Sequence, residues 1–264
     1  MKLEIIEAKP AQKAFPHPLL FIHPLGHAAW YWQENFLPYF AAHGFHCYAM
    51  SLRGHGESEG KKNLRWTSIK SFLADIENTI AKLPANPVLI GDSLGGMLVR
   101  KFLEKYRPPA AVLMSPASQR AAWSFSFKVL QKHPLLFLQL NTTFNVKPLY
   151  STPALYREVF CSEELPEELV KKYQSKTDND SYRLYAELLF GFDKPKNQTA
   201  KTPTLLLTGG KDFTFPKSSY DKIQKELKAK RIALPSLPHE MATDTNWQLA
   251  ADSIIQWLHE LKNK

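Results

Sequence analysis

Apolar residues form five short runs along the chain, all of them of residues that favour strands. None shows the strict alternation of apolar and polar positions that marks a half-exposed strand, so we predict strands buried on both faces, as in a parallel sheet. The runs are PLLFIH (18–23), FHCYAM (45–50), PVLIG (87–91), AAVLMS (110–115) and TLLLTG (204–209). The opening residues, KLEIIE, predict an antiparallel strand at the edge of the sheet.

Between these runs, apolar residues recur with helical spacing. One stripe covers residues 69–80 and follows a Thr-Ser pair that can cap a helix start. Another covers residues 247–261, with Asp244 or Thr245 as the expected cap. Strands that alternate with helices favour βαβ units. We therefore predict an α/β fold with a mostly parallel central sheet flanked by helices.

Residues 118–198 break this rhythm. The segment has no run typical of a buried strand but is dense in aromatic residues, and a Thr-Pro pair at 152–153 and Ser162 are typical of helix starts. A structureless loop of this length is uncommon in a compact domain. We therefore expect a helical cap at 118–198, inserted into a core domain formed by residues 1–117 and 199–264.

Composition and charge restrict the class of partner. The chain has 44% hydrophobic and 22% charged residues, as a globular protein does, and its net charge of +9 could attract nucleic acid or anionic lipid. Basic residues concentrate at 61–65 and 217–231. In the second span Asp221 and Glu226 are interspersed among the lysines, as in a solvent-exposed helix, and we expect the first span to be an exposed loop. The expected partner is a small molecule and not a nucleic acid.

The cellular location is predicted from the apolar runs and the cysteines. No apolar run is long enough for a membrane span, and the N-terminus lacks the apolar core of a secretory signal. Cys47 lies in a strand-like run and Cys161 in a polar stretch, so no disulfide framework is indicated. We expect a cytoplasmic protein without a transmembrane segment, and the sequence assigns no oligomeric state.

The strongest chemical signal is GDSLGG at 91–96, a G-x-S-x-G pattern between a strand-like run and an apolar helix. In a strained strand-to-helix turn the neighbours of the serine must be small, so Gly91 and Gly95 let Ser93 project at the edge of the sheet. Amides at the start of the following helix point to the same place. The pattern alone also fits a glycine-rich turn with an incidental serine, but the flanking strand and helix favour a nucleophile.

A serine nucleophile needs a base and a carboxylate that orients the base. Downstream of Ser93, Asp212 follows a buried run, whereas the run before that one is followed by no carboxylate. Of the two later histidines, His239 lies in a loop and His259 in the predicted C-terminal helix. We predict catalytic roles for Ser93, Asp212 and His239. The alternatives are that Asp212 only forms a turn and that His239 is an exposed loop residue.

The tetrahedral intermediate of acyl transfer needs two donors for its oxyanion. One is the amide of Leu94, which follows the nucleophile. The second is expected from the loop HPLGHAAWYW, where Pro24 has no N–H and Leu25 is the next residue. We therefore predict an oxyanion hole formed by the amides of Leu25 and Leu94.

Five motifs, in this order, resemble those of the α/β-hydrolase family, in particular its single-chain, lidded esterases and lysophospholipase-like hydrolases. The motifs are HPLGHAAWYW (23–32), SLRGHGES (51–58), GDSLGG (91–96), GGKD (209–212) and HEMATDTNW (239–247). The resemblance implies the α/β-hydrolase fold, the same triad and oxyanion donors, and a cap at 118–198. It also implies that RGHG at 53–56 is a structural turn beside the site, without a catalytic role for Arg53 or His55.

Three positions depart from the family's pattern. Pro24 follows His23 where the family often has glycine, which could reshape the oxyanion loop. Ser51 stands where aspartate is common, and Asp92 stands where histidine usually precedes the nucleophile. The Asp92 carboxylate is expected to shift local electrostatics or to contact the cap. None of these departures removes a member of the triad.

We expect a serine hydrolase that cleaves a carboxylic ester or related acyl compound through an acyl-enzyme, with an apolar pocket under the cap. No metal or cofactor is expected, because the sequence has neither an H-E-x-x-H pattern nor clustered Cys/His ligands. Two alternatives keep the fold. One is a non-catalytic protein that binds or senses a small molecule, and the other is a lyase or cofactor-free oxidative enzyme in which Ser93 and His239 act as acid and base.

Overall fold

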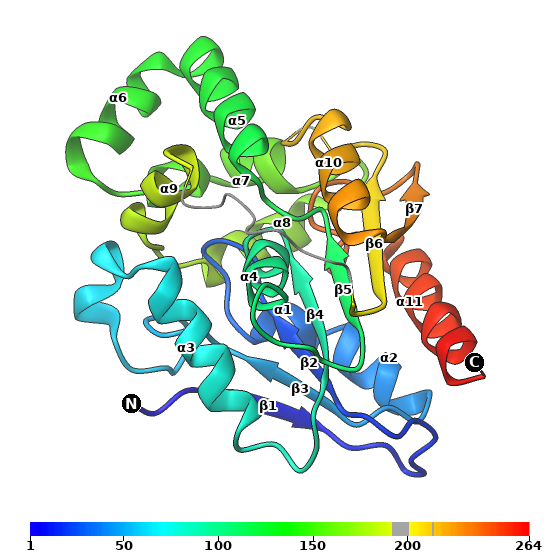
Figure 1. Cartoon of the computed structure of the whole chain (residues 1–264). Coiled ribbons are helices and arrows are strands. Elements are labelled where there is room, and N and C mark those ends of the chain that lie inside the picture. The colour runs from blue at the N-terminus through cyan, green and yellow to red at the C-terminus, as the bar shows by residue number, and fades with distance from the viewer. Residues whose placement is uncertain (192–200, 213, 264) are drawn as a thin grey trace.

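A seven-stranded sheet forms the centre of the molecule in a computed structural model that describes residues 1–191, 201–212 and 214–263. The strand order is β1-β3-β2-β4-β5-β6-β7, and every neighbouring pair is parallel except β1 with β3 (Figure 1). The strands are β1 Ile5–Ala8, β2 Leu19–Ile22, β3 Cys47–Met50, β4 Val88–Asp92, β5 Ala111–Met114, β6 Thr204–Gly209 and β7 Lys230–Leu234. The predicted α/β fold and its antiparallel edge strand are confirmed.

Helices cover both faces of this sheet and account for the apolar character of the strands. Successive residues of β2 point to opposite faces: Leu20 and Ile22 join a core with α3, α4 and α10, whereas Leu19 and Phe21 join one with α1, α2 and α11. The helices on the first face are α3 Ile69–Ile80, α4 Leu94–Phe102 and α10 Ser218–Leu227. Those on the second face are α1 Trp30–Gln33, α2 Phe36–Ala42 and α11 Trp247–Lys262. Strands buried on both sides need no alternation, as predicted.

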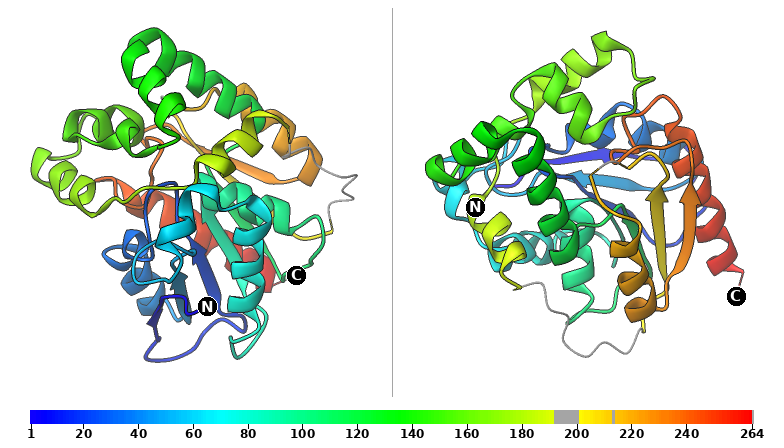
Figure 2. Two further views of the ribbon diagram at one scale, coloured as in Figure 1. Left: turned by 90° about the vertical axis from the view of Figure 1, so that its left-hand side faces the viewer. Right: turned by 90° about the horizontal axis from the view of Figure 1, so that it is seen from above.

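A group of helices separates β5 from β6 in the chain and gathers beyond one end of the sheet (Figures 1 and 2). They are α5 Gln119–Lys132, α6 Pro134–Thr143, the 3₁₀ helix η2 Lys147–Tyr150, α7 Pro153–Phe160, α8 Glu167–Lys176 and α9 Tyr182–Leu189. They share a hydrophobic core of their own, which includes Val146, Tyr156 and Val170. We call residues 119–189 the inserted helices. The division into a core domain and a cap at 118–198 stays a prediction, and residues 192–198 of that range lie outside the described residues.

Two of the predicted helix starts are corrected. Thr152 does cap α7, where its hydroxyl accepts the Leu155 N–H at 3.2 Å. Ser162, however, starts no helix, because α8 begins after Pro166, and the Ser162 hydroxyl instead donates to Asp244 at 2.5 Å. The C-terminal helix begins after Asn246, so neither Asp244 nor Thr245 is its N-cap. The Asp244 carboxylate serves both places, because its Oδ1 accepts the N–H of Asn246, the residue before α11, at 3.1 Å.

The two basic spans also differ from the prediction. Residues 61–65 do not form a loop but belong to a 3₁₀ helix, η1 Lys61–Trp66. The span 217–231 contains α10, as predicted, but its last two residues begin β7. Within the described ranges, no helix combines the length and the apolar character needed to cross a membrane.

Candidate active site

Ser93 occupies a strained turn between β4 and α4. Its backbone has φ 48° and ψ −107°, in the half of dihedral space that side chains rarely adopt. A Cβ at Gly91 would overlap the Gly95 backbone, and a Cβ at Gly95 would overlap the Ile22 carbonyl. The two glycines therefore let the turn pack against β2 while it presents Ser93 at the end of the sheet.

The hydroxyl of Ser93, the ring of His239 and the carboxylate of Asp212 form a hydrogen-bonded chain. His239 Nε2 lies 2.8 Å from Ser93 Oγ, and His239 Nδ1 lies 3.1 Å from Asp212 Oδ2. Asp212 follows β6, and His239 lies between β7 and α11. Parallel strands bring these loops to the same edge, where catalytic groups gather. The structure thus brings together the three residues that the sequence singled out, and their catalytic roles stay a prediction.

Asp212 contacts both its own turn and the ring of His239. Asp212 does shape its turn, because its Oδ1 accepts the N–H groups of Thr214 at 2.8 Å and Phe215 at 3.0 Å. Its other oxygen remains directed at His239 and also accepts the Tyr220 hydroxyl at 2.5 Å. His239 is only 2% exposed, unlike an ordinary loop histidine. One carboxylate therefore fixes the loop and the imidazole together.

Charges around His239 set the protonation of the pair. Burial disfavours the charged ring, but the negative charges of Asp212, Asp92 and Glu240 outweigh it and raise the pKa of His239. Burial would raise the pKa of Asp212, yet the charge of His239 and hydrogen bonds from His239 and Tyr220 hold that pKa below its usual value. The site therefore favours a carboxylate that stabilises a protonated imidazole, as base catalysis requires.

The backbone of the loop after β2 leaves one amide for an oxyanion. Pro24 has no N–H, and its carbonyl accepts from His23 Nδ1 at 2.8 Å and from the His27 N–H at 3.3 Å. The Leu25 carbonyl accepts from His27 Nδ1 at 2.8 Å. Both backbone groups of Gly26 are also bonded: its N–H donates to Asp180 Oδ2 at 2.8 Å and its carbonyl accepts the Asp178 N–H at 2.9 Å.

Leu25 N–H is therefore the only backbone polar group of residues 24–26 without a partner among the described residues. An unpaired amide is free to donate to an oxygen of a bound substrate. Leu25 and Leu94 line the same cavity as Ser93, and Leu94 opens α4, where the helix dipole favours negative charge. The Pro24 departure leaves this amide available, and its role as an oxyanion donor stays a prediction.

A second buried cluster lies beside the loop that carries His239. Tyr156 on α7 donates to Glu240 Oε2 at 3.0 Å and lies 3.0 Å from His27 Nε2. Glu240 Oε1 lies 3.3 Å from the same His27 nitrogen. Glu240 directly follows His239, so this cluster connects the base loop with the inserted helices. The sequence offered no signal for it beyond the adjacency of Glu240.

Asp92 also lies beside the base. It accepts the Tyr31 hydroxyl at 2.5 Å, so its hydrogen bond goes to α1 and not to the inserted helices. Burial raises the pKa of Asp92 to about 7, against the opposing charge of His239. Asp92 therefore gains its charge near neutral pH, and that charge raises the pKa of His239.

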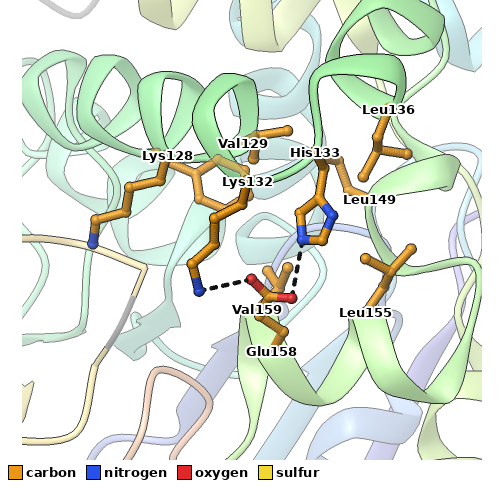
Figure 3. Close-up of a pocket in the computed structure, with 10 residues that line it drawn as sticks. Lys128, Val129, Lys132, His133, Leu136, Leu149, Leu155, Glu158 and Val159 are labelled. Atoms are coloured by element: carbon orange, nitrogen blue, oxygen red, sulfur yellow. Dashed lines mark hydrogen bonds and ion pairs between the residues drawn. The ribbon is translucent and has the colours of Figure 1, made fainter.

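An apolar cavity opens onto Ser93 and His239. Its other walls come mainly from α5, η2, α7 and α9, and include Phe125, Leu149 and Leu188. A neighbouring cavity between α5, α6 and α7 shares Phe125, Leu149 and Val159 with it. Figure 3 shows that second cavity, with Lys132 and His133 directed at Glu158. Among the described residues, no group of three or more His, Cys, Asp or Glu side chains could hold a metal ion.

Comparisons with known proteins agree with this architecture. Residues 17–246 match the family described as serine aminopeptidase, S33. A proline iminopeptidase of Pestalotiopsis fici is 26% identical over 220 residues, or 75% of this chain and 76% of that relative. Epoxide hydrolase 3 of Xenopus tropicalis is 27% identical over 228 residues, or 77% of this chain and 61% of that relative. A solved monoacylglycerol lipase from Paleococcus ferrophilus has a TM-score of 0.73 at 22% identity, covering 99% of this chain and 100% of that one.

Proposed function

This chain belongs to the serine hydrolase family described as serine aminopeptidase, S33, and we propose that it cleaves a carboxylic ester or a related acyl compound. The observation that carries the proposal is the line from Ser93 Oγ through His239 to Asp212, which ends at the wall of an apolar cavity. In this proposal Ser93 is the nucleophile, His239 the general base and Asp212 the residue that orients the base.

The first half of the reaction forms an acyl-enzyme. Ser93 Oγ attacks the carbonyl carbon of the substrate while His239 Nε2 takes the hydroxyl proton. The carbonyl oxygen becomes an oxyanion that accepts hydrogen bonds from the amides of Leu25 and Leu94. When the intermediate collapses, the bond to the leaving oxygen breaks, and His239 gives its proton to the departing alcohol.

The second half returns the free enzyme. A water molecule transfers a proton to His239 Nε2 as its oxygen attacks the acyl carbon. The same two amides hold the second oxyanion. Collapse breaks the bond to Ser93 Oγ, which recovers its proton from His239, and the carboxylic acid leaves. Asp212 keeps the ring in one orientation throughout and stabilises its positive charge.

The cavity favours an ester with an apolar acyl group over a peptide with a free amino terminus. A buried ammonium group needs an anionic partner to offset its loss of hydration. Among the described residues that line the cavity at Ser93, none is an aspartate or glutamate, and the polar ones are Ser93, Tyr150, Tyr185, Thr214 and His239. The proposed substrate is therefore small and apolar, held beneath the inserted helices, which act as a cap.

The direct test combines an active-site probe with a panel of esters. A fluorophosphonate should label the wild-type protein at one residue, and p-nitrophenyl esters of increasing acyl length should be hydrolysed. Ser93→Ala should lose both the label and the turnover while keeping the circular dichroism spectrum of the wild type. Ester hydrolysis that persists in Ser93→Ala would refute the nucleophile. Labelling without turnover of any ester would favour a protein that binds a small molecule.

A further inference from the structure

Asp180 holds the loop that carries the Leu25 amide. It lies between α8 and α9. Its carboxylate contacts Gly26, Ser181 and His55, and none of these belongs to the proposed triad. Its Oδ2 accepts the Gly26 N–H at 2.8 Å, while the Gly26 carbonyl is bonded to the N–H of Asp178. Residues 178–180 therefore bond both the N–H and the carbonyl of Gly26, the residue that follows Leu25.

The surroundings of Gly26 restrict the conformation of the loop that carries Leu25. Gly26 has φ 72°, and a Cβ there would overlap the ring of Tyr150. The Tyr150 hydroxyl in turn donates to the Asp178 carbonyl at 3.0 Å. Residues 178–180 and Tyr150 thus close around Gly26 from the side of the inserted helices, so any movement of that segment displaces the Leu25–Gly26 peptide.

The carboxylate of Asp180 is charged although it is fully buried. Burial opposes ionisation, but the charge of His55 and hydrogen bonds from the N–H groups of Gly26 and Ser181 hold the pKa of Asp180 below its usual value. Burial likewise opposes the charge on His55, and the Asp180 carboxylate raises the pKa of His55 in spite of it. His55 Nε2 lies 3.1 Å from Asp180 Oδ2, and both side chains are fully buried.

A buried pair of this kind contributes more to position than to stability. The cost of removing both charges from water offsets most of their attraction, so such a pair is poor evidence for a stabilising role. The ion pair nevertheless fixes where the Asp180 carboxylate lies, because His55 Nε2 has no hydrogen-bond partner among the described residues and faces Asp180 Oδ2. His55 belongs to the motif RGHG after β3, and His23, which begins the oxyanion loop, lies against it with ring centroids 4.9 Å apart. Burial lowers the pKa of His23 to about 3, so the positive charge is on His55.

We propose that Asp180, locked by His55, is a positioning residue that aims the Leu25 N–H at the oxyanion of the transition state. This inference rests on the proposed acyl transfer, and it gives the inserted helices a part in catalysis beyond shaping the cavity. Asp180 touches no reacting atom. It acts through Gly26, and the oxyanion hole is complete only when residues 178–180 are docked.

The effect should appear in the transition state and not in substrate binding. Loss of one oxyanion donor costs about 10²- to 10³-fold in kcat, so a donor that is merely misaimed should cost less. We expect Asp180→Ala to lower kcat about 10- to 100-fold with KM within threefold of wild type. Asp180→Asn keeps an oxygen for the Gly26 N–H but loses the charge, so it should recover part of the rate.

A trifluoromethyl ketone separates aim from general damage, because its adduct with Ser93 carries an oxyanion. Its inhibition constant should rise in Asp180→Ala by about the same factor as kcat/KM falls. Ser162→Ala is the matched control. Ser162 also joins the inserted helices to the core, through a buried hydrogen bond of 2.5 Å to Asp244, but Asp244 belongs to a different loop from residues 24–26. This control should keep kcat within twofold.

Amide hydrogen exchange provides a measurement that needs no turnover. Peptides covering residues 24–28 should exchange at least tenfold faster in Asp180→Asn than in wild type, and as in wild type in Ser162→Ala. Unchanged exchange there, or a kcat in both Asp180 variants within twofold of wild type, would overturn the inference. So would a rise in KM alone. The proposed function is tested separately: it is wrong if Ser93→Ala still hydrolyses esters. In that case the exchange measurement would still show whether Asp180 holds Gly26 in place.

Discussion

The strand ends and the inserted helices contribute to the candidate site in different ways. Ser93, Asp212 and His239 follow β4, β6 and β7, and the order of those strands brings them together. Asp180 lies between α8 and α9, and Tyr156 lies on α7. Both belong to the inserted helices, which have a hydrophobic core of their own and contact the site from outside the sheet. The sheet thus places the reacting groups, whereas the docked helices orient the backbone and the base loop around them.

The largest effect should come from the strand-end group. Asp212→Asn keeps the size of the side chain but removes the charge that stabilises the protonated His239. We expect kcat to fall by up to about 10⁴-fold, as for the equivalent change in a serine protease. Steady-state ester hydrolysis measures this, and circular dichroism checks that the fold is kept. A loss below tenfold would mean that another carboxylate orients the base, and Asp92 and Glu240 would be the next to substitute.

A smaller effect should come from the docked helices at the base loop. Tyr156→Phe removes the hydroxyl that donates to Glu240 and faces His27, without changing the ring. A hydrogen bond to a charged group contributes about 1.5–3 kcal/mol to folding, so we expect the free energy of unfolding to fall by about that much. We also expect kcat to fall about three- to tenfold, because His239 is held less firmly.

Urea unfolding and ester hydrolysis measure the two effects of Tyr156→Phe. A double-mutant cycle with Glu240→Gln isolates the interaction from the single substitutions. Additive effects of the two changes would show that the hydroxyl and the carboxylate act independently, and the proposed link between α7 and the base loop would be lost.

The smallest effect should be a displacement of the pH profile. The base must be neutral to accept a proton, so activity is present above the pKa of His239 and is lost as the pH falls through it. Because surrounding carboxylates raise that pKa above 6.5, the acidic limb of kcat/KM should have its midpoint above pH 6.5. Asp92→Asn removes one of those charges and keeps an acceptor for the Tyr31 hydroxyl.

We expect the acidic limb of Asp92→Asn to move toward lower pH by less than one unit, with the plateau rate within threefold of wild type. Rate profiles from pH 5 to 9 at constant ionic strength measure the shift. The exposed variant Asp252→Asn is the control, since its carboxylate bonds Tyr39 on the outside of the molecule. An unmoved limb in Asp92→Asn would show that Asp92 is neutral when His239 titrates.

The strand-end part of the site was open to prediction because it follows local rules. The strained turn at Ser93 requires small neighbours, which identifies its glycines. Asp212 comes directly after a buried run, which places it at the carboxyl end of a strand, where catalytic groups gather. Strands β2 to β6 follow from the five apolar runs, and the edge strand β1 follows from the opening residues KLEIIE. These signals lie within a few residues of the group that they place, so no knowledge of the distant chain is needed.

The docked part was not predictable, because its contacts join residues far apart in sequence. Asp180 is separated from Gly26 by 154 positions and belongs to no motif. Ser162 resembled a helix cap because a hydroxyl before an acidic run usually serves that purpose, but Pro166 starts the helix and Asp244 takes the hydroxyl. Local propensity cannot distinguish a polar side chain that caps its own helix from one that bonds across the fold.

Rapid mixing can detect whether Ser93 becomes acylated during turnover. A p-nitrophenyl ester mixed with the wild-type protein should release a burst of one p-nitrophenol per molecule before the steady rate. Acid quenching during the burst, followed by peptide mass spectrometry, should locate one acyl group on Ser93. A steady release with no burst and no acylated peptide, or an acyl group on another residue, would contradict the account.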